Sequence, residues 1–574
     1  MRHPVRRVLR SLGMVKPGDD HARGLRAYEK GRHAAAAAAW LAAARSGHAD
    51  AQHRLGLLYE KGEGVLRNPV DAVAWHRRAA EQGHAEAQAQ LAILHFQGTE
   101  PPPGATPSDP TLELLFPNGI EVKRDFAEAA RWARPAAEQG VARAQALLGC
   151  LHATGLAGPV DPGQARHWYR LAAEQGNPQA QLGYGALLAG DALGEPDPAA
   201  ARVWFERAAG QGNATAWFYL GTLAALGLGE APDHARAARC FRKAAEAGHP
   251  LGQRNLGILH LHGHGVPRNP TTAETWLRKA ALQADAEAMV LLGDLHSRGD
   301  GLPPNLIEAA GWYRAAAELG HRGAQAMLAR LYAAGAGLPR DEREAARWLE
   351  RAAEGGHVPA QIHLGASYAA GRGVEQDLGR ALAWFHKAAE QGSPDAVYNI
   401  GVLHSLGVAE ARPDQPSPID WYRRAAEQGS VLAQFRLAVA YAVGEGVGQD
   451  YAAAAAWSRR AAEQGHAGAQ SNLGRFLMQG YGVARDHAEA ERWLRAAADQ
   501  GTVAAMTALG ELYGGLWGGL WGETPDPAQA RAWLDRAAEA GDPRAAEVRD
   551  QLFAVGEAAP GTAAGTGRPD AEGA

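Results

Sequence analysis

A unit of 36 residues recurs along this 574-residue chain, and this periodicity restricts the fold more than any other feature of the sequence. The segment 75–83, Trp-His-Arg-Arg-Ala-Ala-Glu-Gln-Gly, returns with small changes at 384–392, 421–429 and 457–465. The last residue of this segment marks each repeat, and eleven of the thirteen intervals between markers are 36 or 37 residues. The marker positions are Gly47, Gly83, Gly140, Gly176, Gly212, Gly248, Ala284, Gly320, Gly356, Gly392, Gly429, Gly465, Gly501 and Gly541.

The residues after each marker predict a first helix, helix A. The fourth residue is Ala in thirteen of fourteen copies, and the eighth, eleventh and twelfth are mostly apolar, as in Leu55, Leu58 and Tyr59. This spacing places them on one helical face. The ninth residue is usually Gly, which costs about 1 kcal/mol relative to Ala inside a helix. We therefore expect these glycines to permit a close approach between helices.

A second helix, helix B, is predicted around each tryptophan. Asp or Asn stands seven residues before the Trp position, and Pro follows it directly in several copies, which indicates N-cap and first-turn residues. The predicted caps are Asn68, Asp125, Asp161, Asp197, Asp233, Asn269, Asn305, Asp341, Asp377, Asp414, Asp450, Asp486 and Asp526. The tryptophans, with Cys240 at the same phase in one copy, are expected to form the core.

Repeated helix pairs predict an all-α solenoid over residues 22–553, in which each pair buries its apolar face against its neighbours. Two insertions fall between helices, at about 99–122 and 514–522. The first carries Leu112, Leu114, Leu115 and Phe116, which form either a packed lid or an interaction arm. Residues 1–21 form a basic tail and residues 554–574 an Ala-, Gly- and Pro-rich tail, and both are expected to be disordered.

The consecutive motifs W-Y/F/L-x-x-A-A-E-Q-G, A-Q-x-x-L-G-x-L-Y and G-x-G-V-x-x-D resemble the Sel-one-like repeat family, a relative of the tetratricopeptide repeat, over residues 22–550. This resemblance implies a right-handed superhelix of about 14 antiparallel helix pairs. It also implies a concave surface, lined mainly by A helices, that holds a partner protein or peptide. Members of the family often act as bacterial adaptors in signalling or envelope complexes.

Some cysteine-rich relatives are associated with penicillin binding or β-lactamase activity, so a hydrolase is the alternative function. This chain has only Cys150 and Cys240, about two and a half repeats apart, and lacks the paired cysteines of those relatives. It contains no G-x-x-x-x-G-K-[ST] loop and no Ser-x-x-Lys, and the segment 365–369 lacks the second Gly of a nucleophile elbow. We therefore predict a non-enzymatic protein without a cofactor.

The charge and hydropathy of the chain indicate which kinds of partner and which location to expect. The net charge of -5 and a pI of about 6.5 do not suit a protein that binds phosphate backbones, so nucleic acid is not predicted. The N-terminus carries four arginines but no apolar run long enough for a signal peptide or a membrane span, so a cytoplasmic location is expected. These arginines form either a frayed tail or a weak surface anchor. Self-association through the solenoid ends stays open.

Candidate partner-binding residues lie on the stripe formed by positions seven, ten and fourteen after each marker, where the side chains vary in chemistry. They serve either as polar clamps for a partner or as a solvated face. Two tryptophans in the Gly-rich insertion are further anchors, unless they fold back onto the last helices. The candidates are Arg54, Asp294, Arg330, Asn399, Arg436, Asn472, Arg475, Trp517 and Trp521.

Histidines offer the remaining candidate chemistry. His260, His262 and His264 could chelate a metal, but His260 takes the place of a helix-A Tyr and the other two lie in a turn, so no metal site is predicted. A further six histidines follow marker positions and are interpreted as solvated loop residues. These are His48, His84, His249, His321, His357 and His466.

Overall fold

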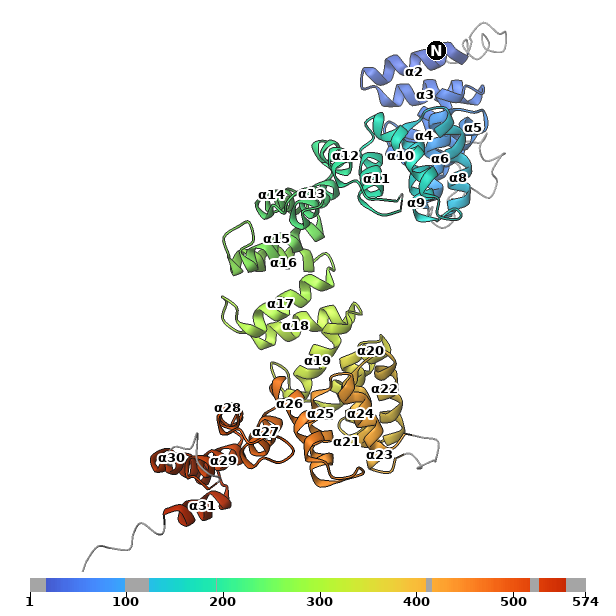
Figure 1. Ribbon diagram of the computed structural model, residues 1–574. Coiled ribbons are helices and arrows are strands. Elements are labelled where there is room, and N and C mark those ends of the chain that lie inside the picture. The colour runs from blue at the N-terminus through green and yellow to red at the C-terminus, as the bar shows by residue number, and fades with distance from the viewer. Residues whose placement is uncertain (1–16, 99–122, 193, 409–415, 517–525, 554–574) are drawn as a thin grey trace, which may run out of the picture. The chain divides into compact units, whose positions relative to one another are not determined.

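A computed structural model describes residues 17–98, 123–192, 194–408, 416–516 and 526–553 of the chain. Over these ranges the protein forms 29 helices and no strand, in the alternating order that the repeats predict (Figure 1). The predicted all-α solenoid of about 14 helix pairs is confirmed. None of these helices has the length and apolarity that crossing a membrane requires. The predicted insertion at 99–122, most of the second insertion and the C-terminal tail lie outside the described residues.

The A helices begin close behind the marker positions and are mostly 13 residues long. The first starts at Pro17, so residues 17–21, which the sequence assigns to the tail, form its first turns. The A helices are α2 (Pro17–Glu29), α4 (Ala49–Lys61), α6 (Ala85–Gln97), α9 (Ala142–Thr154), α11 (Pro178–Ala189), α13 (Ala214–Leu226), α15 (Pro250–His262), α17 (Ala286–Arg298), α19 (Arg322–Ala334), α21 (Val358–Ala370), α23 (Pro394–Ser405), α25 (Val431–Val443), α27 (Ala467–Gln479), α29 (Val503–Tyr513) and α31 (Pro543–Phe553).

The B helices carry the tryptophan segments and end just before the next marker. They are α3 (His33–Arg45), α5 (Pro69–Glu81), α8 (Phe126–Glu138), α10 (Pro162–Glu174), α12 (Pro198–Gly210), α14 (His234–Glu246), α16 (Pro270–Ala281), α18 (Leu306–Glu318), α20 (Glu342–Glu354), α22 (Leu378–Glu390), α24 (Pro418–Glu427), α26 (Tyr451–Glu463), α28 (His487–Asp499) and α30 (Pro527–Glu539).

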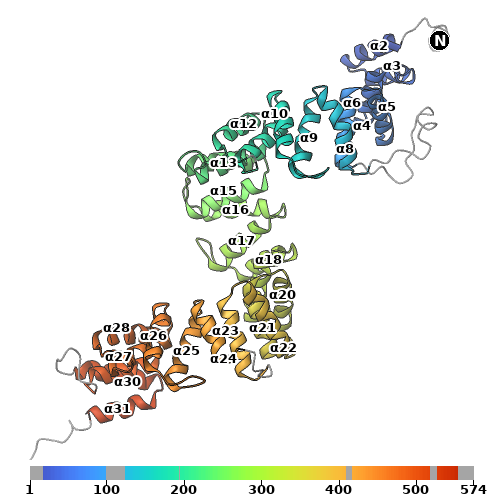
Figure 2. The same cartoon turned by 45° about the vertical axis from the view of Figure 1, so that its right-hand side comes forward.

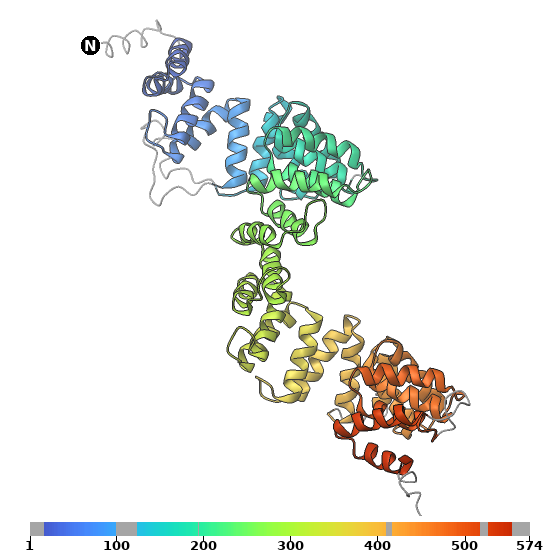
Figure 3. The ribbon, with the colours of Figure 1, turned by 90° about the vertical axis from the view of Figure 1, so that its left-hand side faces the viewer.

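The helices form two units, residues 1–304 with α2–α17 and residues 305–574 with α18–α31. Within each unit every helix packs against the next one along the chain, so that pair stacks on pair (Figures 2 and 3). In several places neighbouring A helices also contact each other, as α9 and α11 do in the first unit and α27 and α29 in the second. The A helices therefore form a row with its own surface in each unit.

The helix-A glycines allow helix B to approach closely, as predicted. A Cβ atom placed on Gly185 would lie 2.7 Å from Cε1 of Phe205, and one on Gly221 would lie 2.6 Å from Cδ1 of Phe241. Both rings belong to the following B helix and are almost completely buried. The cost of a glycine inside each A helix is thus offset by dense packing against a large side chain.

The prediction that the tryptophans form the core is only partly correct, because most of them are partly buried and pack against the core rather than at its centre. Trp204 and Trp312 are only half-buried, whereas the next residues, Phe205 and Tyr313, are 0% exposed. The residue after the tryptophan faces the helix-A glycine, and the tryptophan lies beside it at the edge of the interface. There it commonly carries a cation from one turn later, such as Arg207, whose guanidinium lies 4.5 Å from the Trp204 ring centre.

The helix-B caps form as predicted in twelve copies, where the Asp or Asn side chain accepts a hydrogen bond from a first-turn N–H. The prediction is wrong for Asp414, because α24 begins later and Ser417 is its N-cap. Ser417 and Asp420 form a complete capping box there, with Pro418 in the first turn. This start satisfies two backbone donors, those of Asp420 and of Ser417 itself.

The six histidines that follow marker positions are not solvated loop residues. Each is half-buried and is the N-cap of an A helix, with Nδ1 accepting a hydrogen bond from the N–H three residues later. In α19, for example, the distance from the Ala324 nitrogen to Nδ1 of His321 is 3.0 Å. Histidine is therefore the N-cap in these repeats, in the position that Asn, Asp or Ser occupies in others.

Glutamine side chains connect the repeats. The Gln88 amide on α6 donates to the Ala80 carbonyl at the end of α5, at 3.1 Å, and its oxygen accepts from Gln139 at the end of α8, at 3.2 Å. Equivalent Gln–Gln bonds recur at seven other places. In one repeat Gly355 stands at the position of the second glutamine, and the buried Oε1 of Gln325 has no donor among the described residues.

The marker residues adopt a left-handed backbone, which predicts a stabilising substitution at the one exception. Ala284 has a φ of 63° and is the only non-glycine residue with positive φ in the described ranges. This conformation costs an alanine about 1–2 kcal/mol. We expect Ala284→Gly to raise the free energy of unfolding by about 1 kcal/mol in urea titrations of the full chain, and Gly248→Ala to lower it by a similar amount. Equal stability of all three proteins would contradict this explanation.

Candidate functional site

The predicted stripe residues lie on the A helices, and none of them is deeply buried. Arg330 on α19 is exposed, and the others are half-buried. The stripe is distributed over both units, with Arg54 on α4 and Asp294 on α17 in the first. The second unit carries Arg330 on α19, Asn399 on α23, Arg436 on α25, and Asn472 and Arg475 on α27. Only Asn472 and Arg475 share a helix, one turn apart.

Some of these side chains already have partners. Arg54 donates to Asp50 at 2.8 Å, and Arg436 lies 3.1 Å from Glu445 in an ion pair. Asp294 lies 3.7 Å from Arg298. Within the described part of the chain, Arg475 makes no ion pair or hydrogen bond through its side chain, and its guanidinium is therefore available to a ligand.

Arg475 lines a hollow of about 220 Å³ on the row of A helices in the second unit. The hollow lies across α27, α29 and the start of α31, and successive members of this group are in contact. Its other lining residues are Ala504, Thr507, Ala508, Glu511, Asp542 and Arg544. Here a residue of the predicted stripe lies in a hollow with polar walls.

The acidic residues of the hollow are bonded to its other members. Glu511, whose side chain is 4% exposed, accepts from Arg544 at 2.8 Å. Asp542 accepts from the Thr507 hydroxyl at 2.5 Å and from the Arg544 backbone N–H at 3.0 Å. These bonds fix the walls of the hollow and leave Arg475 as the cation without a counterion among the described residues.

Sequence reasoning missed most of this lining. Glu511 stands at the tenth position after its marker, as Arg475 does, so the repeat phase could have identified it. Asp542 and Arg544 follow the last marker, in a copy that departs from the pattern, and no sequence signal indicated their role. Thr507 lies at the sixth position, beside the stripe rather than on it.

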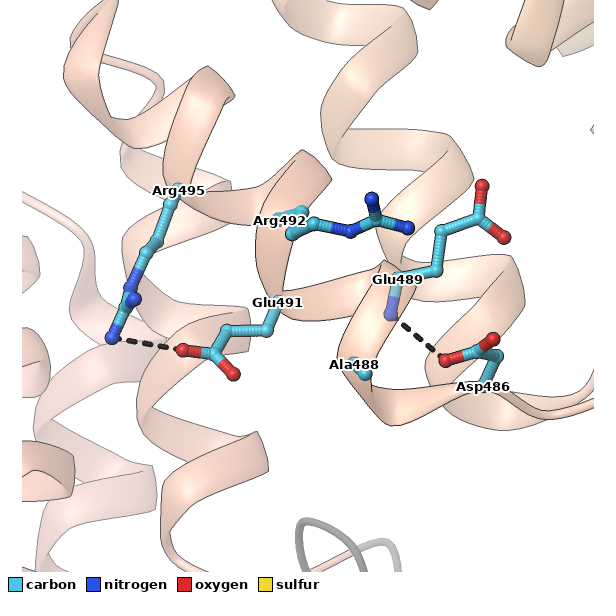
Figure 4. A pocket seen from close by; sticks show the side chains of 6 residues that line it. All are labelled: Asp486, Ala488, Glu489, Glu491, Arg492 and Arg495. Carbon is cyan, nitrogen blue, oxygen red and sulfur yellow. Dashed lines mark hydrogen bonds and ion pairs between the residues drawn. The ribbon is translucent and has the colours of Figure 1, made fainter.

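A second hollow, of about 530 Å³, lies along helix α28 (Figure 4). Its charged residues pair along their own helix, as Arg495 does with Glu491 at 2.8 Å. The Asp486 carboxylate caps the helix by accepting from the Glu489 N–H at 2.8 Å, and Glu489 also pairs with Arg459. These contacts stabilise α28 and its neighbours, and the hollow lies on a B helix rather than on the predicted stripe.

A third hollow, of about 280 Å³, lies in the first unit beside a buried histidine pair. Glu60 on its wall lies 3.4 Å from Nε2 of His76, which is 0% exposed, and Nδ1 of His76 lies 3.2 Å from Nδ1 of His53. Burial first, and then the neighbouring His76 and His84, lower the pKa of His53 to about 3. The two rings are therefore hydrogen-bonded to each other in the interior, and His76 faces Glu60 on its other side.

The residues considered for metal or hydrolase chemistry do not converge. His260 is buried with Nδ1 3.3 Å from the Pro267 carbonyl oxygen, while His262 and His264 are exposed. Ser367 lies inside the continuous helix α21, without the strand-to-helix turn of a nucleophile elbow. Trp517 and Trp521 lie outside the described residues.

Comparison with known proteins gives the family. The family model described as Sel1 repeat matches most of the chain, and two of its matches, 85–112 and 117–141, contain the two helices of one repeat, α6 and α8. The matched residues are 49–84, 85–112, 117–141, 142–177, 178–213, 216–249, 250–285, 286–321, 323–357, 358–393, 394–430, 431–466, 467–502 and 503–542.

Solved structures that are similar to this chain include two bacterial proteins. A protective antigen of uropathogenic Escherichia coli, c5321, which displays an SLR fold, is 27% identical, with 93% of this chain and 99% of that chain covered and a TM-score of 0.55. A Sel1 repeat protein from Oxalobacter formigenes is 36% identical, with 53% of this chain and 89% of that chain covered and a TM-score of 0.47. A search of curated proteins gave no match.

Proposed function

The chain belongs to the Sel1 repeat family, and we propose that it is a non-enzymatic scaffold or adaptor that binds a partner protein or peptide along its row of A helices. The observation that supports this proposal is the A-helix stripe of the second unit. There Arg475 lines a hollow whose other polar side chains are held in place by hydrogen bonds and an ion pair. A solenoid contacts mainly its own neighbouring repeats, so such a row offers an extended surface to a partner.

The hydrolase alternative has no support of this kind. Ser367 is a helix residue in α21, and Cys150 and Cys240 are free thiols rather than a pair. Burial raises the pKa of both thiols, which makes them weaker nucleophiles at neutral pH. The proposed function therefore rests on binding alone.

Affinity capture with two double variants tests the proposal. We expect Arg330→Ala with Arg475→Ala to weaken capture of a partner from the native cells by about tenfold or more, since two polar contacts of about 1 kcal/mol or more are lost. Arg347→Ala with Arg492→Ala removes two exposed arginines from B helices and is the matched control. Quantitative mass spectrometry of the captured proteins measures the difference. Equal losses in both variants would argue against a binding surface on the A helices.

A further inference from the structure

We propose that the hollow between α27, α29 and the start of α31 accepts a carboxylate group of the partner, with the Arg475 guanidinium as its anchor. This inference rests on the proposed function and specifies the chemistry of one contact within it. The ligand group is the side chain of an Asp or Glu, or a chain terminus, in an acidic segment of a protein.

The bonding within the hollow favours an anion over a cation. Each carboxylate in the walls already accepts from neighbours, Glu511 from Arg544 and Asp542 from Thr507. A cationic ligand would compete with these bonds. Arg475 has no such partner in the described ranges and offers several N–H donors in a planar arrangement that matches a carboxylate.

The burial of the walls makes this contact stronger than one on an open surface. Glu511 and Thr507 are buried, with their residues 3% and 4% exposed, so they define a fixed rim with little freedom to rearrange. Arg475 is itself half-buried on the preceding A helix. A carboxylate that enters here is partly removed from water, and its pairing with a guanidinium gains strength in the lower dielectric.

The shape of the hollow comes from two small residues. Ala504 and Ala508 stand one turn apart on α29 and line the space that larger side chains would fill. Ala504 is exposed, whereas Ala508 is 3% exposed. A substitution at 504 can therefore close the hollow without disturbing the core, which separates the shape of the site from its charge.

Fluorescence polarisation with the full chain tests this inference. The probe is a fluorescein-labelled hexapeptide of alternating alanine and glutamate, and its matched analogue carries glutamine in place of glutamate. We expect the acidic peptide to bind at least about tenfold more tightly than the analogue, as one charge-assisted contact of 1.5 kcal/mol or more provides. Arg475→Met and Ala504→Leu should each remove this preference, and Arg475→Lys should retain part of it.

Arg492→Met is the control, because Arg492 is an exposed arginine on the B helix of the same repeat. It should bind the acidic peptide as the unchanged protein does. Equal binding of the two peptides, no binding of the acidic one, or equal losses in Arg475→Met and Arg492→Met would each overturn the inference. If Arg475→Met fails to alter peptide binding while Arg330→Ala with Arg475→Ala still loses the cellular partner, the carboxylate site is wrong and the proposed function stands.

Discussion

Replacing Phe205 with alanine is expected to lower the free energy of unfolding by about 3–5 kcal/mol, the usual cost of removing a fully buried aromatic ring. The ring is 0% exposed, with Gly185 against one side and the Tyr219 ring stacked at 5.1 Å. The cavity would lie between two helix pairs and weaken both. Urea unfolding of the full chain, together with amide hydrogen exchange of α11–α13, measures the effect.

Trp204→Ala is the matched comparison, because the two residues are adjacent on α12. Trp204 is half-buried, and part of its contact surface is the Arg207 guanidinium rather than the core. Its loss should cost no more than about 2 kcal/mol, in proportion to the smaller area removed from water. If Trp204→Ala lowered the free energy of unfolding as much as Phe205→Ala or more, the tryptophan rather than Phe205 would be the central residue of the interface.

Acidification from pH 7 to pH 5 is expected to lower the free energy of unfolding by about 2 kcal/mol through His53 alone. Its pKa is about 3 in the folded chain and about 6.5 when unfolded. The unfolded state therefore binds the proton first, and stability is complete above about pH 6.5 and is lost as the pH falls toward 3. The slope is about 1.4 kcal/mol per pH unit between these values.

His53→Leu tests this contribution, since Leu182 stands at the same repeat position in another A helix. From pH 7.5 to pH 5 the unfolding free energy of the unchanged protein should fall by about 2 kcal/mol more than that of the variant, because the variant lacks the titrating group. The range ends at pH 5 to avoid the carboxylates, among them Glu60, whose pKa lies below its ordinary value because hydrogen bonds from His76 and Gln90 outweigh burial. Parallel curves would exclude His53 as the cause.

The helix pairs could be predicted from the sequence because each repeat carries the same local signals for the start and end of its helices. Asp or Asn before helix B and Gly after it are recognised from backbone chemistry alone. Periodicity says less about how deeply each side chain is buried. Trp204 and Phe205 lie on the same apolar side of the helix, and only packing decides which of them faces Gly185. The prediction for Asp414 was wrong for a related reason, because Ser417, within the longer interval, forms a capping box with Asp420 and begins the helix there.

The candidate site was only partly predictable. Repeat phase identified Arg475, because a variable polar residue on an A helix is visible in aligned copies. The hollow itself depends on Ala504 in the next repeat and on Asp542 beyond the last marker, residues that converge through packing rather than through spacing. The Gln–Gln bonds were also missed, although the 30-residue separation of Gln52 and Gln82 recurs and contained the signal.

The amide bonds between repeats favour changes in the number of repeats by whole units. At eight of the junctions between described repeats the same donors and acceptors recur, as Gln88 does with Ala80 and with Gln139. Within a stretch of repeats that share these bonds, excision of one unit from marker to marker would join two surfaces that already match. Recombination within such a stretch can thus lengthen or shorten the array by whole repeats while each junction keeps the same bonds.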